Sequence, residues 1–159
     1  MANKSKECFS TEYERCRKVV ADITSREEAS ALTNIGIERL SNIESGKTEP
    51  TPYDILNMAE AYGTPYLYNY YCHSKCPIGQ KWVPEITVSD ISDITIKILS
   101  ALVSIEEEKN RLIEIVDDKT VSPDEEDDFE LIKKNLTKII ASASALLVWA
   151  KENTKSSDE

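Results

Sequence analysis

Two cysteines and a histidine lie close together near the middle of the chain, and these side chains can bind metals or undergo redox chemistry. Cys72 and Cys76 are four residues apart, so on a helix they share one face, and His73 adds a third potential ligand. A structural zinc site takes four ligands, and the other two cysteines, Cys8 and Cys16, would lie about 12 Å apart along a helix. The pattern favours two packed thiols and leaves a thiol or metal sensor as an alternative.

No combination of residues in the sequence forms a recognisable catalytic site. The chain has one histidine, His73, and it lacks a nucleophile motif and a glycine-rich phosphate-binding loop. Its closely spaced carboxylates are better explained as helix caps. We therefore expect neither an enzyme nor a bound cofactor.

The charge balance restricts the partners of this protein. The 159 residues include 19 Lys and Arg against 29 Asp and Glu, which gives a net charge of -10. This charge disfavours nonspecific adhesion to phosphate backbones or anionic membranes. No segment is apolar over the length needed to span a bilayer, and the first residues lack the apolar core of a signal peptide. We expect a cytoplasmic protein with no membrane partner.

Helix start and stop signals divide the first half of the chain into five short helices. Capping boxes at Thr11 and Ser25 predict the first two, with Val20 at an apolar position of the first and Ala29 and Leu32 facing inward on the second. The expected helices cover residues 11–21, 25–32, 37–45 and 52–62, and a fifth begins near residue 65. Five of the seven tyrosines lie in the segment 62–71, and without interleaved Lys or Arg they favour the seal of a small core over a base-stacking platform.

The second half of the chain has a longer pattern. Pro77, Gly79 and Pro84 predict a linker, after which apolar residues recur every three or four positions. The first seam consists of Ile91, Ile94, Ile98, Leu102, Ile105, Leu112 and Val116, and the second of Phe129, Ile132, Leu136, Ile139, Ala143, Leu146 and Ala150. Ser122 and Pro123 predict the start of the second helix. The expected organisation is a domain at 8–72, a linker at 73–87, a helical hairpin at 88–151 and a frayed tail at 152–159.

Two long helices joined by a short turn pack antiparallel, and each seam alone leaves one side of the hairpin exposed. We therefore expect the exposed side of the hairpin to pack against a further surface. It either folds back on the first domain or pairs with a second copy of the chain, and the pattern does not choose between them.

The segment 25–48 contains a capped helix, a three-residue turn at residues 34–36 and a second helix that ends in IESGK at residues 43–47. This run resembles the lambda-repressor-like helix-turn-helix family, also called the xenobiotic-response-element family of prokaryotic regulators. The wider similarity covers about residues 8–71, and the hairpin resembles that of a subgroup of such regulators. The resemblance implies an all-α protein, with a five-helix lambda-repressor-like DNA-binding domain followed by a long antiparallel two-helix hairpin.

By that resemblance, the helix at residues 37–45 would lie in the major groove of double-stranded DNA. Asn42 would pair with adenine, Glu38 would accept a hydrogen bond from a cytosine amine, and Ile37 would contact a thymine methyl. Glu44 would support the turn. The residues implied to contact DNA are Arg26, Gly36, Ile37, Glu38, Arg39, Ser41, Asn42 and Lys47.

The phosphate contacts implied in this way are few: Arg26, Arg39 and Lys47. A monomer with two or three cationic contacts binds weakly at physiological salt, so useful affinity requires a dimer on a site with two halves. We therefore expect a sequence-specific transcription regulator, homodimeric through its hairpin. The alternatives are a protein-interaction module that has lost DNA binding, and a thiol- or metal-responsive regulator acting through Cys72 and Cys76.

Overall fold

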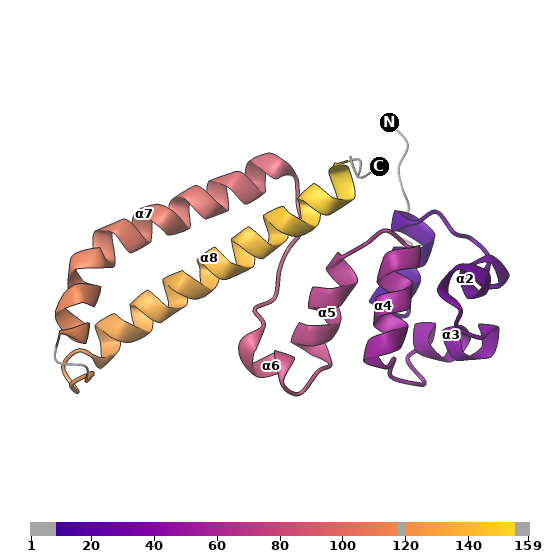
Figure 1. The fold of residues 1–159 in the computed structure, drawn as a ribbon, viewed down its shortest axis with the longest axis horizontal. Helices are drawn as coiled ribbons and strands as arrows, with labels where there is room; N and C mark the ends of the chain where they lie inside the picture. Colours follow the sequence, from indigo (N-terminus) through magenta and orange to yellow (C-terminus); the bar gives the residue numbers. More distant parts are fainter. Residues whose placement is uncertain (1–8, 118–119, 155–159) are drawn as a thin grey trace. The chain divides into compact units, whose positions relative to one another are not determined.

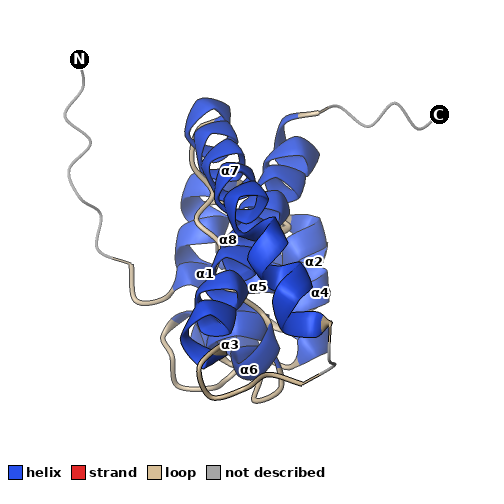
Figure 2. Cartoon of the chain, turned by 90° about the vertical axis from the view of Figure 1, so that its left-hand side faces the viewer, coloured by secondary structure: helices blue, strands red, loops and turns tan. Residues whose placement is uncertain are grey.

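The computed structural model describes residues 9–117 and 120–154, which form helices and loops and contain no strand (Figure 2). Within the described residues the chain is all-α, which confirms the expected fold class. It divides into two compact units, residues 1–75 and 76–159. Cys8, the expected start of the first domain, and the end of the expected tail lie outside the described residues.

Local capping sets the helices of the first unit. These are α1 (Glu12–Arg15), α2 (Arg26–Thr33), α3 (Ile37–Glu44), α4 (Pro52–Ala61) and α5 (Tyr66–Ser74) (Figure 1). The Thr11 hydroxyl accepts a hydrogen bond from the Glu14 amide at 3.3 Å, and Ser25 caps α2 in the same way. Thr51 and Asp54 cap α4 reciprocally. Side-chain oxygens thus satisfy amides that have no partner within the helix.

The first helix differs from its expected form. A π-helix over Cys16–Val20 follows α1, where the sequence predicted a continuous α-helix to residue 21. Its wider turn changes the direction of the side chains that follow. Val20, expected at an apolar position, and Leu32, expected to face inward, are 44% and 53% exposed. On α2 the inward side is formed by Ala29, as expected, and by Thr33 in place of Leu32.

The turn between α2 and α3 depends on one residue in the left-handed conformation. Asn34 has a φ of 56°, a region that asparagine tolerates better than most residues. Gly46, just beyond α3, has a φ of 73° and ends that helix as expected.

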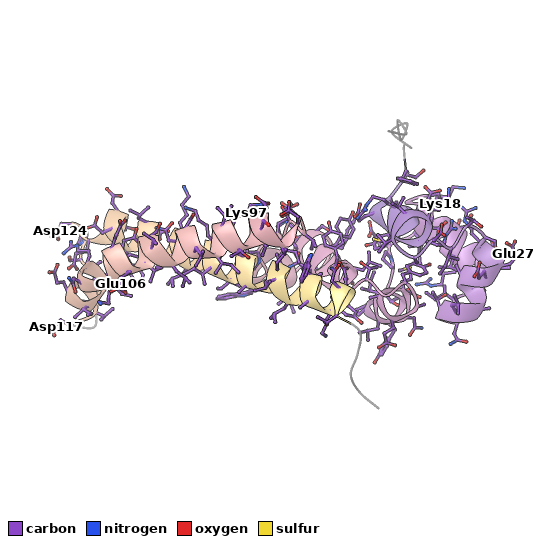
Figure 3. The ribbon with its side chains drawn as sticks, turned by 90° about the horizontal axis from the view of Figure 1, so that it is seen from above. Lys18, Glu27, Lys97, Glu106, Asp117 and Asp124 are labelled. Carbon is purple, nitrogen blue, oxygen red and sulfur yellow. The ribbon has the colours of Figure 1, made fainter. Side chains whose placement is uncertain are left out.

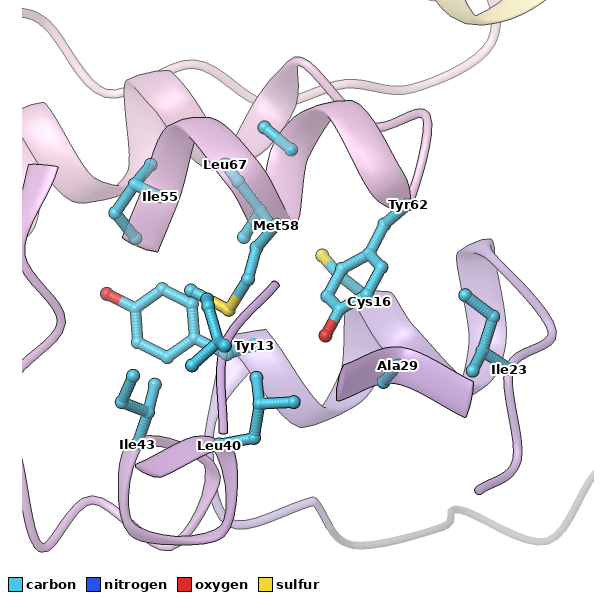
Figure 4. Close-up of a cluster of buried hydrophobic side chains, with 12 residues drawn as sticks. Tyr13, Cys16, Ile23, Ala29, Leu40, Ile43, Ile55, Met58, Tyr62 and Leu67 are labelled. Atoms are coloured by element: carbon cyan, nitrogen blue, oxygen red, sulfur yellow. The ribbon is translucent and has the colours of Figure 1, made fainter. Parts of the chain in front are cut away.

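A single apolar core lies between the helices of the first unit (Figure 4). It consists of Tyr13, Cys16, Ile23, Ala29, Ile35, Leu40, Ile43, Ile55, Met58, Ala59, Tyr62 and Leu67. Several tyrosines of the segment 62–71 pack around it. Tyr70 meets Tyr13 edge to face, with ring centroids 5.6 Å apart. These contacts confirm that the tyrosine-rich segment seals the core.

The second unit contains a short helix, α6 (Gly79–Trp82), within the expected linker, and then the long helices α7 (Ile91–Val116) and α8 (Glu126–Asn153). The two long helices run antiparallel and pack along their length (Figure 1). Asp90 caps α7 by accepting from the Asp93 amide at 3.0 Å. No described helix is long and apolar enough to cross a membrane.

The start of α8 lies four residues after the Ser122 cap that the sequence predicted. The Ser122 amide and hydroxyl instead donate to the Glu125 carboxylate, at 3.1 and 2.6 Å. These bonds form a turn before the helix. Glu126 and the two aspartates after it occupy the first helical turn, where negative charge is favourable.

The contact between α7 and α8 uses only part of the expected seam, with Ile94 and Ile132 buried as expected. Leu102 and Leu136 were assigned to the seam, but they are 48% and 41% exposed. Ala101 and Asn135, each one position earlier in the chain, are buried instead. One position changes the direction of a helical side chain by about 100°. At these positions the contact is therefore rotated from the expected arrangement.

A polar contact accompanies this rotation. The Asn135 side-chain amide donates to a Glu108 carboxylate oxygen at 2.7 Å, and the Lys138 ammonium donates to the Asn135 carbonyl oxygen at 2.9 Å. Asn135 is buried, so its amide depends on these partners.

We expect Asn135→Ala to lower the free energy of unfolding by about 1 to 3 kcal/mol, because it leaves Glu108 without its buried donor. Asn110→Ala, at an exposed position of α7, is the matched control and should change stability by less than about 0.5 kcal/mol. Urea unfolding followed by circular dichroism measures both. Equal unfolding midpoints for the two variants would show that the contact does not stabilise the hairpin.

Candidate nucleic-acid interface

Helix α3 has two unlike sides. Leu40, Ile43 and Glu44 are at most 1% exposed and face the core. Ile37 is 44% exposed, and Glu38 is exposed beside it. This division follows from the helical period, which places residues three or four positions apart on the same side. The helix is therefore anchored on one side and open on the other.

A groove with a volume of about 680 Å³ lies along the open side of α3 and the start of α2. It is lined by Arg17, Lys18, Thr24, Ser25, Arg26, Glu27, Ile37, Glu38, Ser41 and Asn42. Five of the residues that the resemblance implied to contact DNA are thus brought together. The other three, Gly36, Arg39 and Lys47, do not line the groove.

The groove is supported by a buried cluster of charges. The Glu44 carboxylate accepts hydrogen bonds from Arg17 Nε at 2.5 Å and Nη2 at 3.0 Å, and the side chains of both residues are 1% exposed. Arg17 also donates to the carbonyl oxygens of Ile23 and Thr24. Opposite charges and hydrogen bonds together compensate the desolvation of this pair. The carboxylate raises the pKa of Arg17.

A second arginine joins this cluster from the surface. Arg26 Nε donates to Glu44 Oε2 at 2.7 Å, and the Arg26 side chain remains 38% exposed. The Thr11 hydroxyl donates to the Glu44 backbone oxygen at 3.0 Å. Glu44 therefore joins α3 to the start of α2 and to the segment before α1. It holds Arg26 at the edge of the groove.

Arg39 lies apart from the groove, in an ion pair with α4. Its Nε donates to Asp54 Oδ1 at 3.0 Å, and Nη2 contacts Oδ2. This guanidinium lowers the pKa of Asp54 from 3.8 to about 2, and the Thr51 cap adds to the shift. A phosphate contact by Arg39 would have to share the guanidinium with Asp54.

Sequence reasoning missed several residues of the groove. Lys18 lines it and forms an ion pair with Glu14 at 2.8 Å, a spacing of four residues that favours such a pair. Ser25 was identified only as a cap. Nothing in the local pattern indicated Arg17, because its partner Glu44 is 27 residues away in sequence.

The cysteines considered for a metal or redox site lie on or just after α5. Cys72 is within the helix, Cys76 follows it, and both are thiols of intermediate exposure. Among the described residues, no group of three or more His, Cys, Asp or Glu side chains is arranged to hold a metal. Cys8 lies outside those residues.

Comparison with known proteins identifies the domain that contains this groove. Residues 15–69 match the model of a helix-turn-helix family. The match includes α2, the turn and α3, and it supports a helix-turn-helix DNA-binding regulator in general. Neither the curated proteins nor the solved structures contain a match to this chain.

We expect Glu44→Gln to lower the free energy of unfolding by about 3 to 5 kcal/mol, because Arg17 stays buried without its counter-ion. Glu38→Gln makes the same chemical change at an exposed position of α3 and should alter stability by less than about 0.5 kcal/mol. Urea unfolding at neutral pH compares them. Similar midpoints for the two variants would contradict a stabilising role of the cluster.

The lowered pKa of Asp54 also predicts a pH dependence. A carboxyl whose folded pKa is depressed stabilises the protein above its unfolded pKa, and this stability is lost as the pH falls from about 4 towards 2. The shift from 3.8 to about 2 corresponds to about 2 kcal/mol. Asp54→Asn should therefore lower stability at pH 7 and reduce the loss below pH 4.

Urea unfolding at a series of pH values tests this expectation. Glu60→Gln, at an exposed position of the same helix, is the control and should keep the wild-type pH dependence. A wild-type pH profile in Asp54→Asn would show that the Arg39 pair does not link folding to pH.

Proposed function

We propose that this protein is a DNA-binding transcription regulator that reads its operator with α3. The observation that carries the proposal is the groove, which gathers an apolar side chain, a carboxylate and an amide from α3 beside an arginine from α2. An α-helix fits the major groove of DNA, and these side chains match the groups displayed there. The helix-turn-helix match over residues 15–69 supports the same function.

Each side chain on the open side of α3 has a corresponding base contact. Asn42 suits the paired donor and acceptor of adenine, and Glu38 accepts from the amine of cytosine. Ile37, at the start of the helix, suits the methyl group of thymine. Ser41 donates to or accepts from any base and adds less selectivity.

The contacts to phosphate would be fewer than usual. Arg26 presents its exposed guanidinium at the start of α2, where the helix terminus also favours an anion. Arg39 and Lys47 are the other cations proposed to contact the backbone. Few phosphate contacts give weak binding at physiological salt. The proposal therefore includes a homodimer through α7 and α8 on an operator with two half-sites about one helical turn apart.

Selection of bound duplexes from a random pool tests the proposal, followed by anisotropy titration of the best duplex at two salt concentrations. An enriched motif with two similar halves, bound more weakly at higher salt, would support a dimeric regulator. Failure to enrich any motif, with weak binding that is entirely sensitive to salt, would reject it.

A direct hydrogen bond from Asn42 to adenine predicts how substitution of Asn42 changes DNA affinity. Asn42→Ala should weaken binding to the selected operator by about 1 to 3 kcal/mol and relax the preference at one base position of each half-site. Asn57→Ala, at an exposed position of α4 outside the groove, should leave affinity and preference unchanged. Equal affinities for the two variants would exclude Asn42 as a reader.

A protein-interaction module is the second candidate, because two acids line the groove. Glu27 and Glu38 place negative charge where DNA phosphates would approach, in a chain of net charge -10. Arg26→Glu separates the candidates at low salt. A regulator should lose DNA binding in this variant, whereas an interaction module should show no DNA binding to lose. Circular dichroism checks that the variant folds.

A further inference from the structure

The hairpin has an apolar surface that its own two helices do not cover. Where α7 and α8 meet, Ile94 and Ala101 of α7 face Ile132 and Ala145 of α8, and all four are buried. A second set of apolar side chains remains between 41% and 68% exposed. Its members are Leu99, Leu102, Ile113, Val116, Leu136, Ile140 and Leu147. We call this set the apolar face.

These residues lie on the same side of the hairpin because of helical geometry. On α7, Leu102 and Val116 each follow a buried residue by one position, and on α8 Leu136 follows buried Asn135 in the same way. One position rotates a side chain by about 100° in the right-handed sense. Because the helices are antiparallel and face each other, this rotation brings both sets to one side. The spacing of three and four continues each row along its helix.

Two polar contacts near the turn show which residues of the two helices lie side by side. Asn135 of α8 bonds Glu108 of α7, and Arg111 of α7 bonds Asp128 of α8 at 2.7 Å. The segment of α7 around Leu99 therefore lies beside the segment of α8 around Ile140. Exposed leucines and isoleucines from both helices thus lie near one another at this level of the hairpin.

The opposite side of the hairpin has a different character. A shallow groove of about 360 Å³ runs there between the helices, lined by Ile96, by alanines and serines, and by Lys97 and Lys138. Ser100 lies in this groove and is exposed. Charged side chains such as Lys97 project from the long helices (Figure 3). The apolar face holds most of the exposed apolar side chains of the two long helices, and others such as Ile96, Val103 and Leu131 lie outside it.

The charges within the apolar face are balanced. The spacing places Glu106 and Lys109 in its α7 row, and they are joined by a hydrogen bond of 2.7 Å. Lys133, next in the α8 row, pairs with Glu130 at 2.5 Å. The chain as a whole carries a net charge of -10, so two copies repel each other over most surfaces. A balanced apolar face is where a second copy meets least repulsion.

The size of the face also fits a second copy. Helices of 26 and 28 residues are each about 40 Å long, and two neighbouring helices are about 20 Å wide. One whole side of the hairpin therefore measures about 800 Å², similar to the area that each partner contributes to a stable interface of standard size, and the apolar face lies within that side.

We propose that two copies of this chain dimerise by packing their apolar faces together, which forms a four-helix bundle from two hairpins. This inference rests on the proposed function, which requires two copies of the chain. The choice of the surface between them comes from the hairpin alone. An isologous contact of this kind uses the same surface on both copies. No such surface is left for a third copy, so the assembly is a dimer.

Leu99→Glu and Ser100→Glu are matched variants of the full chain. They introduce the same acid at adjacent exposed positions of α7, but the first lies in the apolar face and the second in the opposite groove. Light scattering after size-exclusion chromatography measures the mass. Wild type and Ser100→Glu should have twice the monomer mass of 17.9 kDa, and Leu99→Glu should have the monomer mass. Ile140→Glu should reproduce the result from α8.

Two outcomes would overturn this proposal: a monomeric wild type, or dimers that persist in both Leu99→Glu and Ile140→Glu. Circular dichroism checks that each variant keeps the wild-type helix content, and a variant that loses it is replaced by Leu147→Glu. Binding to a single half-site duplex at low salt separates this proposal from the proposed function. A monomer that still binds the half-site would reject the dimer surface alone, and a dimer that binds no duplex would reject the DNA-binding function alone.

Discussion

The buried carboxylate of Glu44 is the constraint on which the geometry of the first unit depends. Removing an ionised group from water costs several kcal/mol unless opposite charges and hydrogen bonds compensate. Here the compensation comes from Arg17, in the π-helix, and from Arg26, at the start of α2. Three separate segments are thus held at fixed positions around one side chain. The open side of α3 and the groove beside it owe their shape to these bonds.

The features that sequence reasoning anticipated are those that depend on nearby residues. Thr11 and Ser25 cap α1 and α2 through residues three positions away, and the turn predicted at residues 34–36 separates α2 from α3. The exposed side of α3 follows from the same short period, since Leu40 and Ile43 occupy the buried side. Elements with such local causes are readable from one sequence.

The features that were missed depend on partners far away in the chain. Arg17 bonds Glu44 and Asn135 bonds Glu108, and in both cases the partners are 27 residues apart. Periodicity favoured Leu136 as the seam residue. Nothing in the local sequence indicated that Asn135 would be buried there instead. Only the packing of α7 against α8 decides between them. Leu102, Val116 and Leu136, which the expected seam would have buried, are left exposed.

The two-sided construction of α3 has a consequence for how this protein can diversify. Ile37, Glu38 and Asn42 lie on the open side, so exchanging them alters the chemistry presented to a partner without entering the core. Leu40 and Ile43 keep the helix in place regardless of that choice. Descendants of one ancestor can therefore acquire new preferences by single exchanges while their thermal stability is preserved. The fold should tolerate substitutions at these open positions in a randomised laboratory library in the same way.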